Sequence, residues 1–362
     1  MARIDAILKL VKEQGASDLH LTTGSPPMIR LHGEILPIPH EPLTKEACEL
    51  LLFELMDVQS RARYDQVKDV DFCYEVPGVA RARANIFEHS KGPAGAFRML
   101  PSEIMSMEQL GLPAWLSKFT DMPRGLVVVT GPPGTGKSST LAALIDHINR
   151  TQKKHILTIE DPIEFKHVNK QCLITQREVG RNTPTFSKAL HAALREDPDV
   201  ILVGEMRDPE TMALAMTAAA TGQLVFGTLH TMSATQTIDR ILDSFDGERQ
   251  GQARLMLSES LRGVLAQRLL RKPDGHGRAL ALEVLVGTPA VSALIREKKT
   301  FQLGSVIQTG KKDGMQSMDE ALMALIQDGS VSAKDAAPHF SNPEVAAQME
   351  RRDSVVFRRD AA

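Results

Sequence analysis

The stretch GPPGTGKSST, residues 131–140, follows the apolar run LVVV at 126–129 and precedes a helical pattern of apolar residues that continues to Ile148. It fills every fixed position of the pattern Gly-x-x-x-x-Gly-Lys-Ser, in the order strand, glycine-rich turn and helix. Glycines let successive backbone N–H groups point at phosphate oxygens, and the start of the following helix adds positive partial charge. The stretch therefore predicts an α/β domain with a phosphate-binding loop for a nucleoside triphosphate.

Within this loop, Lys137 is expected to reach the β- and γ-phosphates, and the Ser138 hydroxyl is expected to ligate Mg²⁺. An ordinary glycine-rich turn is the alternative, and it is disfavoured because all fixed positions are filled. The residues predicted to bind ATP are Gly131, Pro132, Pro133, Gly134, Thr135, Gly136, Lys137, Ser138, Ser139 and Glu160.

Length and composition set the frame for this loop. A chain of 362 residues predicts two or three domains, and a net charge of −2 gives no argument for a nucleic-acid or anionic-membrane partner. Three widely spaced cysteines match no metal-site or disulfide pattern, which favours a reducing cytoplasm. No apolar run approaches the roughly 18 residues of a membrane span. The first residues, which include Asp5 and Glu13, indicate an amphipathic helix and not a signal peptide. With neither a span nor a signal peptide, we expect membrane association only through a partner.

Residues 1–100 have an organisation of their own. Apolar residues at 4, 7, 8 and 11 share one helical face, and a second helix is predicted over 44–56. Short strands are predicted at 17–23, 28–38, 69–76, 79–87 and 95–100. This pattern predicts a small α+β domain, followed at 101–122 by a linker that contains a short helix.

Residues 123–340 are predicted to form the nucleotide-binding domain. Apolar strands at 126–130, 155–159, 199–203 and 224–229 alternate with helices, which is typical of a mostly parallel sheet. After about residue 243 the chain is predicted to be helical, most clearly at 247–271 and 317–328. Residues 341–362 show weak periodicity and are predicted to be a partly disordered tail.

Acidic residues follow two of these strands. Glu160 and Asp161, with Glu164 close behind, end the strand at 155–159, and Glu205 follows the strand at 199–203. Ligands of α/β sheets bind outside the carboxyl ends of the strands. Carboxylates there can hold Mg²⁺ or act as general base on water, so Glu205 is a candidate metal ligand beside Ser138. A solvated acidic turn is the alternative.

Two further features allow more than one interpretation. Arg207 and Asp208 could form a capping ion pair for the helix that begins near Pro209. His230, at the end of the fourth strand, could sense the γ-phosphate, contact a neighbouring subunit, or be structural.

Arginines alternate with small apolar residues in VARARANIF, residues 79–87. A period of two places Arg81 and Arg83 on one face of a strand, and Arg98 lies on the next predicted strand. One interpretation is that they supply positive charge to a phosphate held by another domain or subunit. The other is a solvated face with cross-strand acids such as Asp71.

The order of these motifs resembles the type II/IV secretion ATPase superfamily, and within it the pilus-retraction (twitching-motility) ATPases. The resemblance covers residues 3–330. It rests on GASDLHLTTGSPPMIRLHG (15–33), PGVAR (77–81), the phosphate loop, ILTIEDPIEF (156–165), ALREDPDVILVGEMRD (193–208), TGQLVFGTLHT (221–231) and MLSESLRGVLAQRLL (256–270).

The resemblance implies a RecA-like ATPase core with a small PAS-like N-terminal domain, assembled as a homohexamer. It implies that Glu164 is the catalytic base, that Glu205 is the Walker B glutamate of the stretch 193–208, and that His230 is the histidine of the family's His box, the stretch 221–231. It also implies that Arg81, Arg83 and Arg98 face the nucleotide. Mg²⁺ and ATP are the implied cofactors, and an inner-membrane pilus platform protein is the implied partner, at the cytoplasmic face of the membrane.

The chain departs from the family pattern at two places. The His box, residues 221–231, has Gln223 where a second histidine is usual. The segment AVSALIRE, residues 290–297, has Ser292 and Ala293 where the retraction signature has Arg and Asn. An accessory pilus motor, working with a paralogous pilus ATPase, therefore remains an alternative.

A pilus-assembly or secretion ATPase is a second alternative. Such proteins usually have a longer N-terminus and a four-cysteine loop, whereas this sequence begins at the small α+β domain and has no Cys-x-x-Cys. A nucleic-acid motor is disfavoured because no basic stretch interleaved with aromatic residues is present, and a scaffold that binds ATP without turnover is disfavoured by the intact Lys137, Glu164 and Glu205.

Overall fold

The computed structural model describes residues 2–101, 103–275, 277–342 and 344–349. The chain forms two compact units. The N-terminal unit comprises Met1–Glu103 and the short segment Pro162–Lys166, and the C-terminal unit comprises Ile104–Asp161 and His167–Ala362. The chain therefore crosses between the units three times. Of the tail predicted at 341–362, residues 343 and 350–362 lie outside the described residues.

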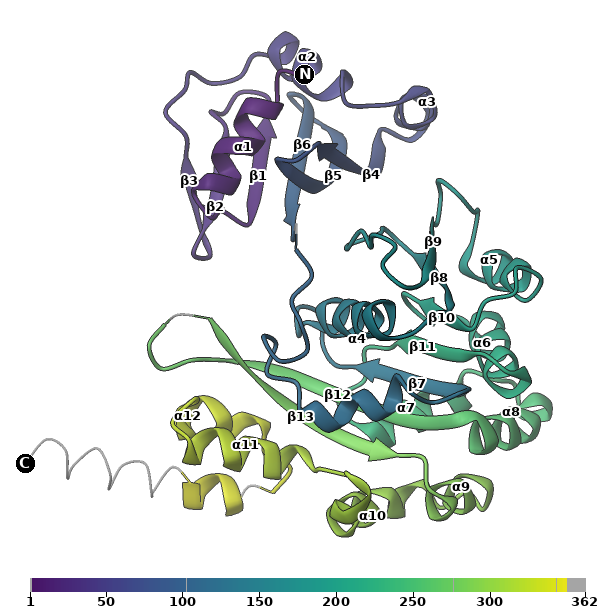
Figure 1. Cartoon of the computed structure of the whole chain (residues 1–362). Helices are drawn as coiled ribbons and strands as arrows, with labels where there is room; N and C mark the ends of the chain where they lie inside the picture. The colour runs from purple at the N-terminus through teal and green to yellow at the C-terminus, as the bar shows by residue number, and fades with distance from the viewer. Residues whose placement is uncertain (1, 102, 276, 343, 350–362) are drawn as a thin grey trace, which may run out of the picture. The chain divides into compact units, whose positions relative to one another are not determined.

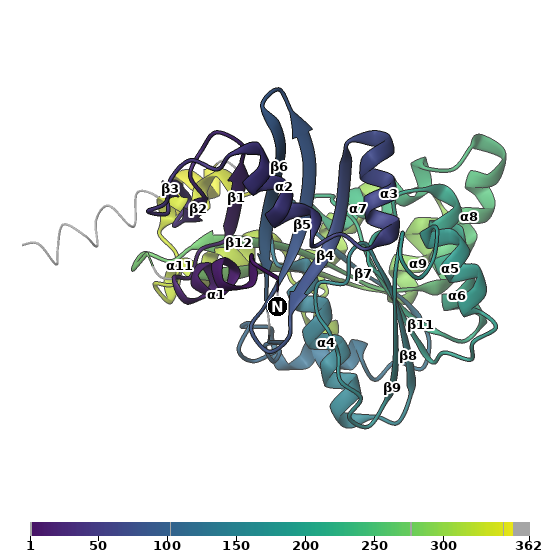
Figure 2. The ribbon, with the colours of Figure 1, turned by 90° about the horizontal axis from the view of Figure 1, so that it is seen from above.

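The N-terminal unit is built on one antiparallel sheet, with the strand order β3-β2-β1-β6-β5-β4. Figure 2 shows β4, β5 and β6 side by side. The strands are β1 (Asp18–Thr22), β2 (Met28–Leu31), β3 (Glu34–Pro37), β4 (Asp69–Val76), β5 (Ala80–His89) and β6 (Gly92–Leu100). These strands confirm those predicted for residues 1–100.

Helices pack on one face of this sheet. They are α1 (Asp5–Glu13), α2 (Lys45–Phe53) and α3 (Val58–Val67), the last of which the sequence did not predict. Leu8 of α1, Leu52 of α2 and Phe97 of β6 share one core with the alternate residues Ala82 and Ile86 of β5. The period of two predicted for β5 is therefore present, and it leaves the arginines of this strand outside the core.

The C-terminal unit is built on a seven-stranded sheet with the order β13-β12-β7-β11-β10-β8-β9. All neighbouring strands are parallel except β13, which pairs antiparallel with β12 at one edge. Figure 1 shows these strands, and the mostly parallel α/β sheet predicted from the sequence is confirmed. The strands are β7 (Gly125–Thr130), β8 (His155–Glu160), β9 (Leu173–Glu178), β10 (Val200–Val203), β11 (Leu224–Thr228), β12 (Leu261–Arg271) and β13 (Arg278–Val286).

Both faces of this sheet are covered, and β7 shows why its sequence is apolar throughout. Leu126 and Val128 belong to one core and Val127 and Val129 to the other. A parallel strand between two layers of helices is buried on both sides, so it has a continuous apolar run instead of an alternating one.

The helices of this unit fall into three groups. Helix α4 and the short helix η1 contribute to one core, α5 to α10 to the other, and α11 and α12 pack on the β12–β13 hairpin. Their bounds are η1 (Ala114–Phe119), α4 (Lys137–Thr151), α5 (Phe186–Ala193), α6 (Pro209–Thr221), α7 (Ala234–Asp243), α8 (Gly247–Ser260), α9 (Pro289–Arg296), η2 (Thr300–Gln302), α10 (Leu303–Thr309), η3 (Lys311–Asp313), α11 (Met318–Gln327), α12 (Ala333–Ala336) and η4 (Ala337–His339).

The helical structure predicted after about residue 243 is wrong for two segments, which form the strands β12 and β13. The helix predicted over 247–271 ends at Ser260, and residues from Leu261 on form β12, which pairs with β7 and with β13. The apolar residues of LRGVLAQRLL are compatible with either period. The segment forms a strand because it pairs with β7, which lies more than a hundred residues earlier in the chain, and with β13, which follows after a turn.

Within the described part of the chain, no helix has both the length and the apolar composition needed to cross a bilayer.

Candidate nucleotide site

The phosphate loop joins the carboxyl end of β7 to the first residue of α4, as predicted. Gly131, Gly134 and Gly136 all have positive φ angles, of 142°, 78° and 83°. A Cβ at Gly131 would lie 2.4 Å from the carbonyl oxygen of Gln267, so no other residue fits there without a shift of β12. Gly136 is the N-cap of α4, so the loop ends on a helix N-terminus, which is a favourable place for an anion.

Lys137 lies under this loop. Its side chain is buried, and its ammonium donates hydrogen bonds to the carbonyl oxygens of Gly131 at 2.8 Å and Pro132 at 3.0 Å. Thr135 Oγ1 also donates to Pro132, at 2.8 Å. The ammonium group of Lys137 is therefore hydrogen-bonded to the same loop whose backbone would surround a phosphate. Ser138 and Ser139 follow in the first turn of α4, with partly exposed side chains.

The same lysine connects to two other predicted residues. Its ammonium lies 3.3 Å from Nδ1 of His230, and Nε2 of that ring lies 3.0 Å from Oε1 of Glu205. Three side chains from three separate motifs are thus linked by two hydrogen bonds at the carboxyl ends of β7, β10 and β11. The structure thus brings together Lys137, Glu205 and His230, each of which the sequence named separately as a candidate site residue.

The environment of Glu205 keeps its carboxylate ionised. Burial raises the pKa of this carboxyl, but the hydrogen bond and charge of Arg207, together with His230, hold it below its usual value. Arg207 Nη2 lies 2.7 Å from Glu205 Oε2. The capping ion pair suggested for Arg207 and Asp208 is wrong, because Asp208 alone caps α6 by accepting from the backbone N–H of Thr211 at 2.8 Å.

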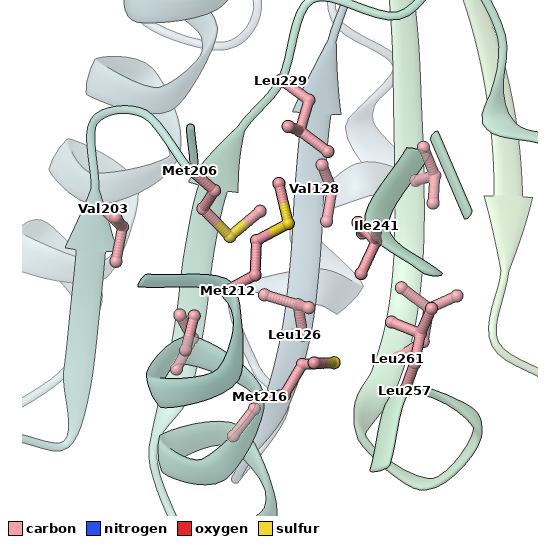
Figure 3. Close-up of a cluster of buried hydrophobic side chains, with 14 of the residues drawn as sticks. Leu126, Val128, Val203, Met206, Met212, Met216, Leu229, Ile241, Leu257 and Leu261 are labelled. Atoms are coloured by element: carbon pink, nitrogen blue, oxygen red, sulfur yellow. The ribbon is translucent and has the colours of Figure 1, made fainter. Parts of the chain in front are cut away.

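The backbone on both sides of Glu205 is fixed. Gly204 donates to the carbonyl of Ile159 at 2.7 Å, and Met206 donates to the carbonyl of Thr228 at 3.1 Å. Figure 3 shows the Met206 side chain among the buried residues between the sheet and its helices. A Cβ at Gly227 would lie 2.8 Å from Met206 Cε, so this glycine makes room for the methionine. The Glu205 turn is thus anchored to both neighbouring strands.

The loop that carries His230 is tied to the end of β7. Thr130 Oγ1 donates to the carbonyl of Thr231 at 2.9 Å, and the hydroxyls of Thr231 and Thr237 are 2.6 Å apart. Thr130 immediately precedes the phosphate loop. The position of His230 relative to the loop is therefore set by short polar contacts.

Glu160 ends β8, as predicted, and its carboxylate has local partners. Oε1 accepts from Thr158 Oγ1 at 2.7 Å and from Gln176 Nε2 at 3.3 Å. Asp161, the next residue, is exposed. The α-carbon of Glu160 lies 3.2 Å from where a Cβ of Gly204 would stand, so the ends of β8 and β10 are adjacent.

Glu164 belongs to the N-terminal unit together with the predicted arginines. Arg81, which is buried, donates from Nη1 to the carbonyl of Glu164 at 3.1 Å and from Nη2 to the carbonyl of Ile163 at 2.8 Å. Lys166 forms an ion pair with Glu75 of β4. The five-residue segment is thus bound to the sheet of this unit by main-chain and charged contacts.

Arg83 and Arg98 lie directly opposite each other on β5 and β6. Each has a carboxylate near its Nε atom, Asp71 for Arg83 at 3.7 Å and Asp18 for Arg98 at 3.1 Å. Burial raises the pKa of Asp18, while Ser17 and Arg98 lower it to a net value below the usual one. The cross-strand acids predicted as an alternative are therefore present beside both arginines.

Two residues that contact the phosphate loop were missed from the sequence. Gln267 Nε2 donates to the carbonyl of Thr135 at 2.5 Å, and Arg278 Nη1 donates to that of Gly134 at 3.1 Å. Gln267 lies within a quoted motif, but no local signal marked it, because its segment was interpreted as helix.

A phosphate loop at the end of a parallel strand, with a lysine, a histidine and a strand-end carboxylate in contact, defines a phosphate-loop nucleotide-binding protein of the α/β class. The comparison with known proteins is more specific. A family model described as "Type II/IV secretion system protein" matches residues 2–337. The chain belongs to this family, which confirms the resemblance found in its motifs.

Individual relatives align with most of the chain. The type IV pilus retraction ATPase PilT of Pseudomonas aeruginosa is 51% identical over 341 residues, which cover 94% of this chain and 99% of that protein. The type IV pilus ATPase PilU of the same organism is 38% identical over 335 residues, covering 92% and 88%. A crystal structure of the pilus retraction motor PilT with bound ADP has a TM-score of 0.88 at 45% identity, covering 95% of this chain and 98% of that one.

Proposed function

We propose that this chain is an ATP-hydrolysing motor that drives retraction of a type IV pilus. The observation that carries the proposal is the 51% identity to PilT over nearly the full length of both chains. The contact between Lys137, His230 and Glu205 supports it, because the residues of three family motifs meet at one site. PilT and its structure with bound ADP confirm the class of ATPase predicted from the sequence.

The residues divide the work of phosphoryl transfer in the following way. Backbone N–H groups of the phosphate loop and the Lys137 ammonium neutralise the β- and γ-phosphates. Glu164 accepts the proton of the attacking water as general base. His230 holds the Glu205 carboxylate in place through its Nε2 atom.

Ser138 and Glu205 are the residues that would hold Mg²⁺. Their chemistry suits it, since this ion prefers hydroxyl, carboxylate and phosphate oxygens. Glu205 is ionised and held by Arg207 and His230, and Ser138 lies one residue beyond the lysine on α4. Bound Mg²⁺ would neutralise charge on the transferred phosphoryl group.

The assembly is a homohexamer in which Arg81, Arg83 and Arg98 supply positive charge to a nucleotide once the ring has formed. The ring acts on an inner-membrane platform protein at the cytoplasmic face of the membrane. The positions of Arg83 and Arg98 support this part of the proposal, because two partly exposed guanidinium groups lie opposite each other on β5 and β6, where a phosphate could accept from both.

Deletion of the gene followed by imaging of labelled pili tests the function. Persistent fibres that no longer shorten would support retraction, whereas absence of fibres would point to pilus assembly instead. Restored shortening by the wild-type chain but not by Lys137→Ala would link retraction to the nucleotide site. Normal retraction in the deletion strain would contradict the proposal.

The accessory motor is the second candidate, and Ser292 and Ala293 are the observation that favours it. The identity of 51% to PilT against 38% to PilU favours the retraction motor. Expression of this chain as the sole retraction ATPase separates the two, since an accessory motor alone would leave fibres unretracted.

A further inference from the structure

The β12–β13 hairpin contacts the outer side of the phosphate loop through two side chains. Gln267 of β12 donates from Nε2 to the carbonyl oxygen of Thr135 at 2.5 Å, and Arg278 of β13 donates from Nη1 to the carbonyl oxygen of Gly134 at 3.1 Å. The two acceptors are consecutive residues of the loop. The hairpin therefore holds two adjacent peptide groups by their oxygens.

These two carbonyls determine where two loop N–H groups point. In a trans peptide the C=O and the following N–H point in opposite directions. Holding the oxygens of Gly134 and Thr135 toward the hairpin thus directs the N–H groups of Thr135 and Gly136 away from it. Backbone N–H groups at these positions of a phosphate loop are the ones that surround the phosphates of a nucleotide.

Gln267 is an unusual residue to find in this core. It is 1% exposed, and its Oε1 atom has no hydrogen-bond partner among the described residues. Its orientation is nevertheless fixed, because a carbonyl oxygen at Thr135 can only be met by the NH₂ end of the amide. A buried polar atom without a partner is unfavourable, so an apolar residue would serve packing better. The hydrogen bond from Gln267 Nε2 to the loop carbonyl therefore explains why a glutamine occupies this position.

The backbone of β12 adds a second support at the same level. Ala266 pairs with Thr130, the residue before the loop, and the carbonyl of Gln267 lies against Gly131 at the distance that excludes a Cβ. The same hairpin holds the helix after His230, since Glu283, opposite Ala266, accepts from the backbone N–H of Ala234 at 2.7 Å. One rigid hairpin thus fixes both the phosphate loop and the start of α7.

We propose that Gln267 and Arg278 are positioning residues for phosphate binding, which hold the carbonyls of Thr135 and Gly134 so that the loop N–H groups face the nucleotide. This inference rests on the proposed nucleotide-binding function. Gln267 acts from within the sheet, whereas Arg278 is exposed and acts from the start of β13.

The test compares Gln267→Met with Gln316→Met by calorimetric titration with ADP and with pyrophosphate, well below the thermal midpoint of each variant. Gln316 is a matched control, because its Nε2 also donates to a backbone carbonyl of the same hairpin, that of Leu282 at 3.0 Å, but does not touch the loop. Met preserves side-chain length without the donor. We expect Gln267→Met to weaken the binding of both ligands by the same factor, about tenfold. This is the scale of one loop N–H that no longer donates to a charged phosphate. We expect the affinities of Gln316→Met to stay within about twofold of wild type.

Arg278→Met gives a second measurement, in which no buried residue is changed. Arg271→Met is its control, because Arg271 is also exposed and pairs with Arg278 across the hairpin. We expect about a threefold loss of ADP affinity for Arg278→Met and none for Arg271→Met, since an exposed contact contributes less. If Gln267→Met fails to fold, the comparison of Arg278→Met with Arg271→Met tests the inference instead, and equal ADP affinities of these two variants would contradict it.

Two further results would overturn the inference. One is ADP affinity of folded Gln267→Met within about twofold of wild type, whatever happens to its thermal midpoint. The other is an equal loss in Gln316→Met. A wild-type chain that binds neither ADP nor pyrophosphate would instead overturn the proposed function, which keeps the two failures apart.

Discussion

The ammonium group of Lys137 and the imidazole of His230 share a hydrogen bond of 3.3 Å between Nζ and Nδ1. Because an ammonium only donates, Nδ1 is the acceptor, so a neutral ring carries its proton on Nε2. That N–H points at Glu205 Oε1, 3.0 Å away. The cation of the phosphate loop therefore selects the tautomer that donates to the strand-end carboxylate, and a phosphate that draws Lys137 away would change the bonding of both partners.

Lys137→Ala is expected to abolish ATP hydrolysis and to weaken nucleotide binding strongly, since it removes the cation held under the phosphate loop. Phosphate release and titration with ADP measure the two effects. Phosphate release within about threefold of wild type would mean that the loop is assigned wrongly.

Glu205→Ala and Glu164→Ala should each retain ATP binding while slowing turnover by roughly a hundredfold or more, the scale of losing metal positioning or a general base. Exposed Glu259→Ala is the control in the C-terminal unit and should hydrolyse ATP at the wild-type rate. Parallel loss of binding and turnover would identify Glu205 and Glu164 as structural residues.

Arg83→Ala and Arg98→Ala should lower turnover without preventing hexamer formation, because these arginines are expected to act on nucleotide only in the assembled ring. Exposed Arg63→Ala in the same unit is the control. Measuring turnover against protein concentration, with mass determined by light scattering, tests the idea. A clearly monomeric sample that hydrolyses ATP at full speed would refute it.

Arg296→Ala should keep the ring and its ATPase activity but abolish pilus retraction in cells. The helix α9 buries Val291 and Ile295, whereas Arg296 at its end is exposed, so its loss should cost about 1 kcal/mol or less. Val291→Ala, by contrast, should lower thermal stability. Normal twitching by Arg296→Ala at wild-type protein level would leave this segment with a packing role alone.

His167 predicts a pH dependence of stability. Burial lowers its pKa from 6.5 to about 4, with nearby Asp146 and Lys170 acting in opposite directions. The unfolded chain therefore binds the extra proton first as pH falls, and the free energy of unfolding should decrease between about pH 6.5 and 4, by at most about 1.4 kcal/mol per pH unit. Denaturant titrations of His167→Gln should show a shallower decrease than wild type, and exposed His191→Gln should not. Equal slopes for His167→Gln and wild type would contradict a buried neutral imidazole.

The parts of the fold that the sequence predicted are those whose signal is local. The strand at Leu126 is apolar on both faces and ends in a loop with a fixed pattern, and Glu205 and His230 follow strands of the same kind. β12 was missed because residues such as Leu261 and Leu265 fit a helical period as well as a strand.

Contacts that depend on how distant strands pair could not be predicted from the sequence either. Gln267 meets Thr135 only because Ala266 pairs with Thr130, and no local pattern specifies that pairing. The partners of Arg81 were equally hidden, since the carbonyls of Ile163 and Glu164 come from a segment 80 or more residues later.

The N-terminal unit is not continuous in sequence. The segment Pro162–Lys166 is held to its sheet by hydrogen bonds from Arg81 and by the ion pair of Lys166 with Glu75. A fragment that ends at Glu103 would therefore leave the buried guanidinium of Arg81 without the two carbonyl oxygens to which it donates. The fold of this unit is complete only when the chain has been synthesised beyond residue 166.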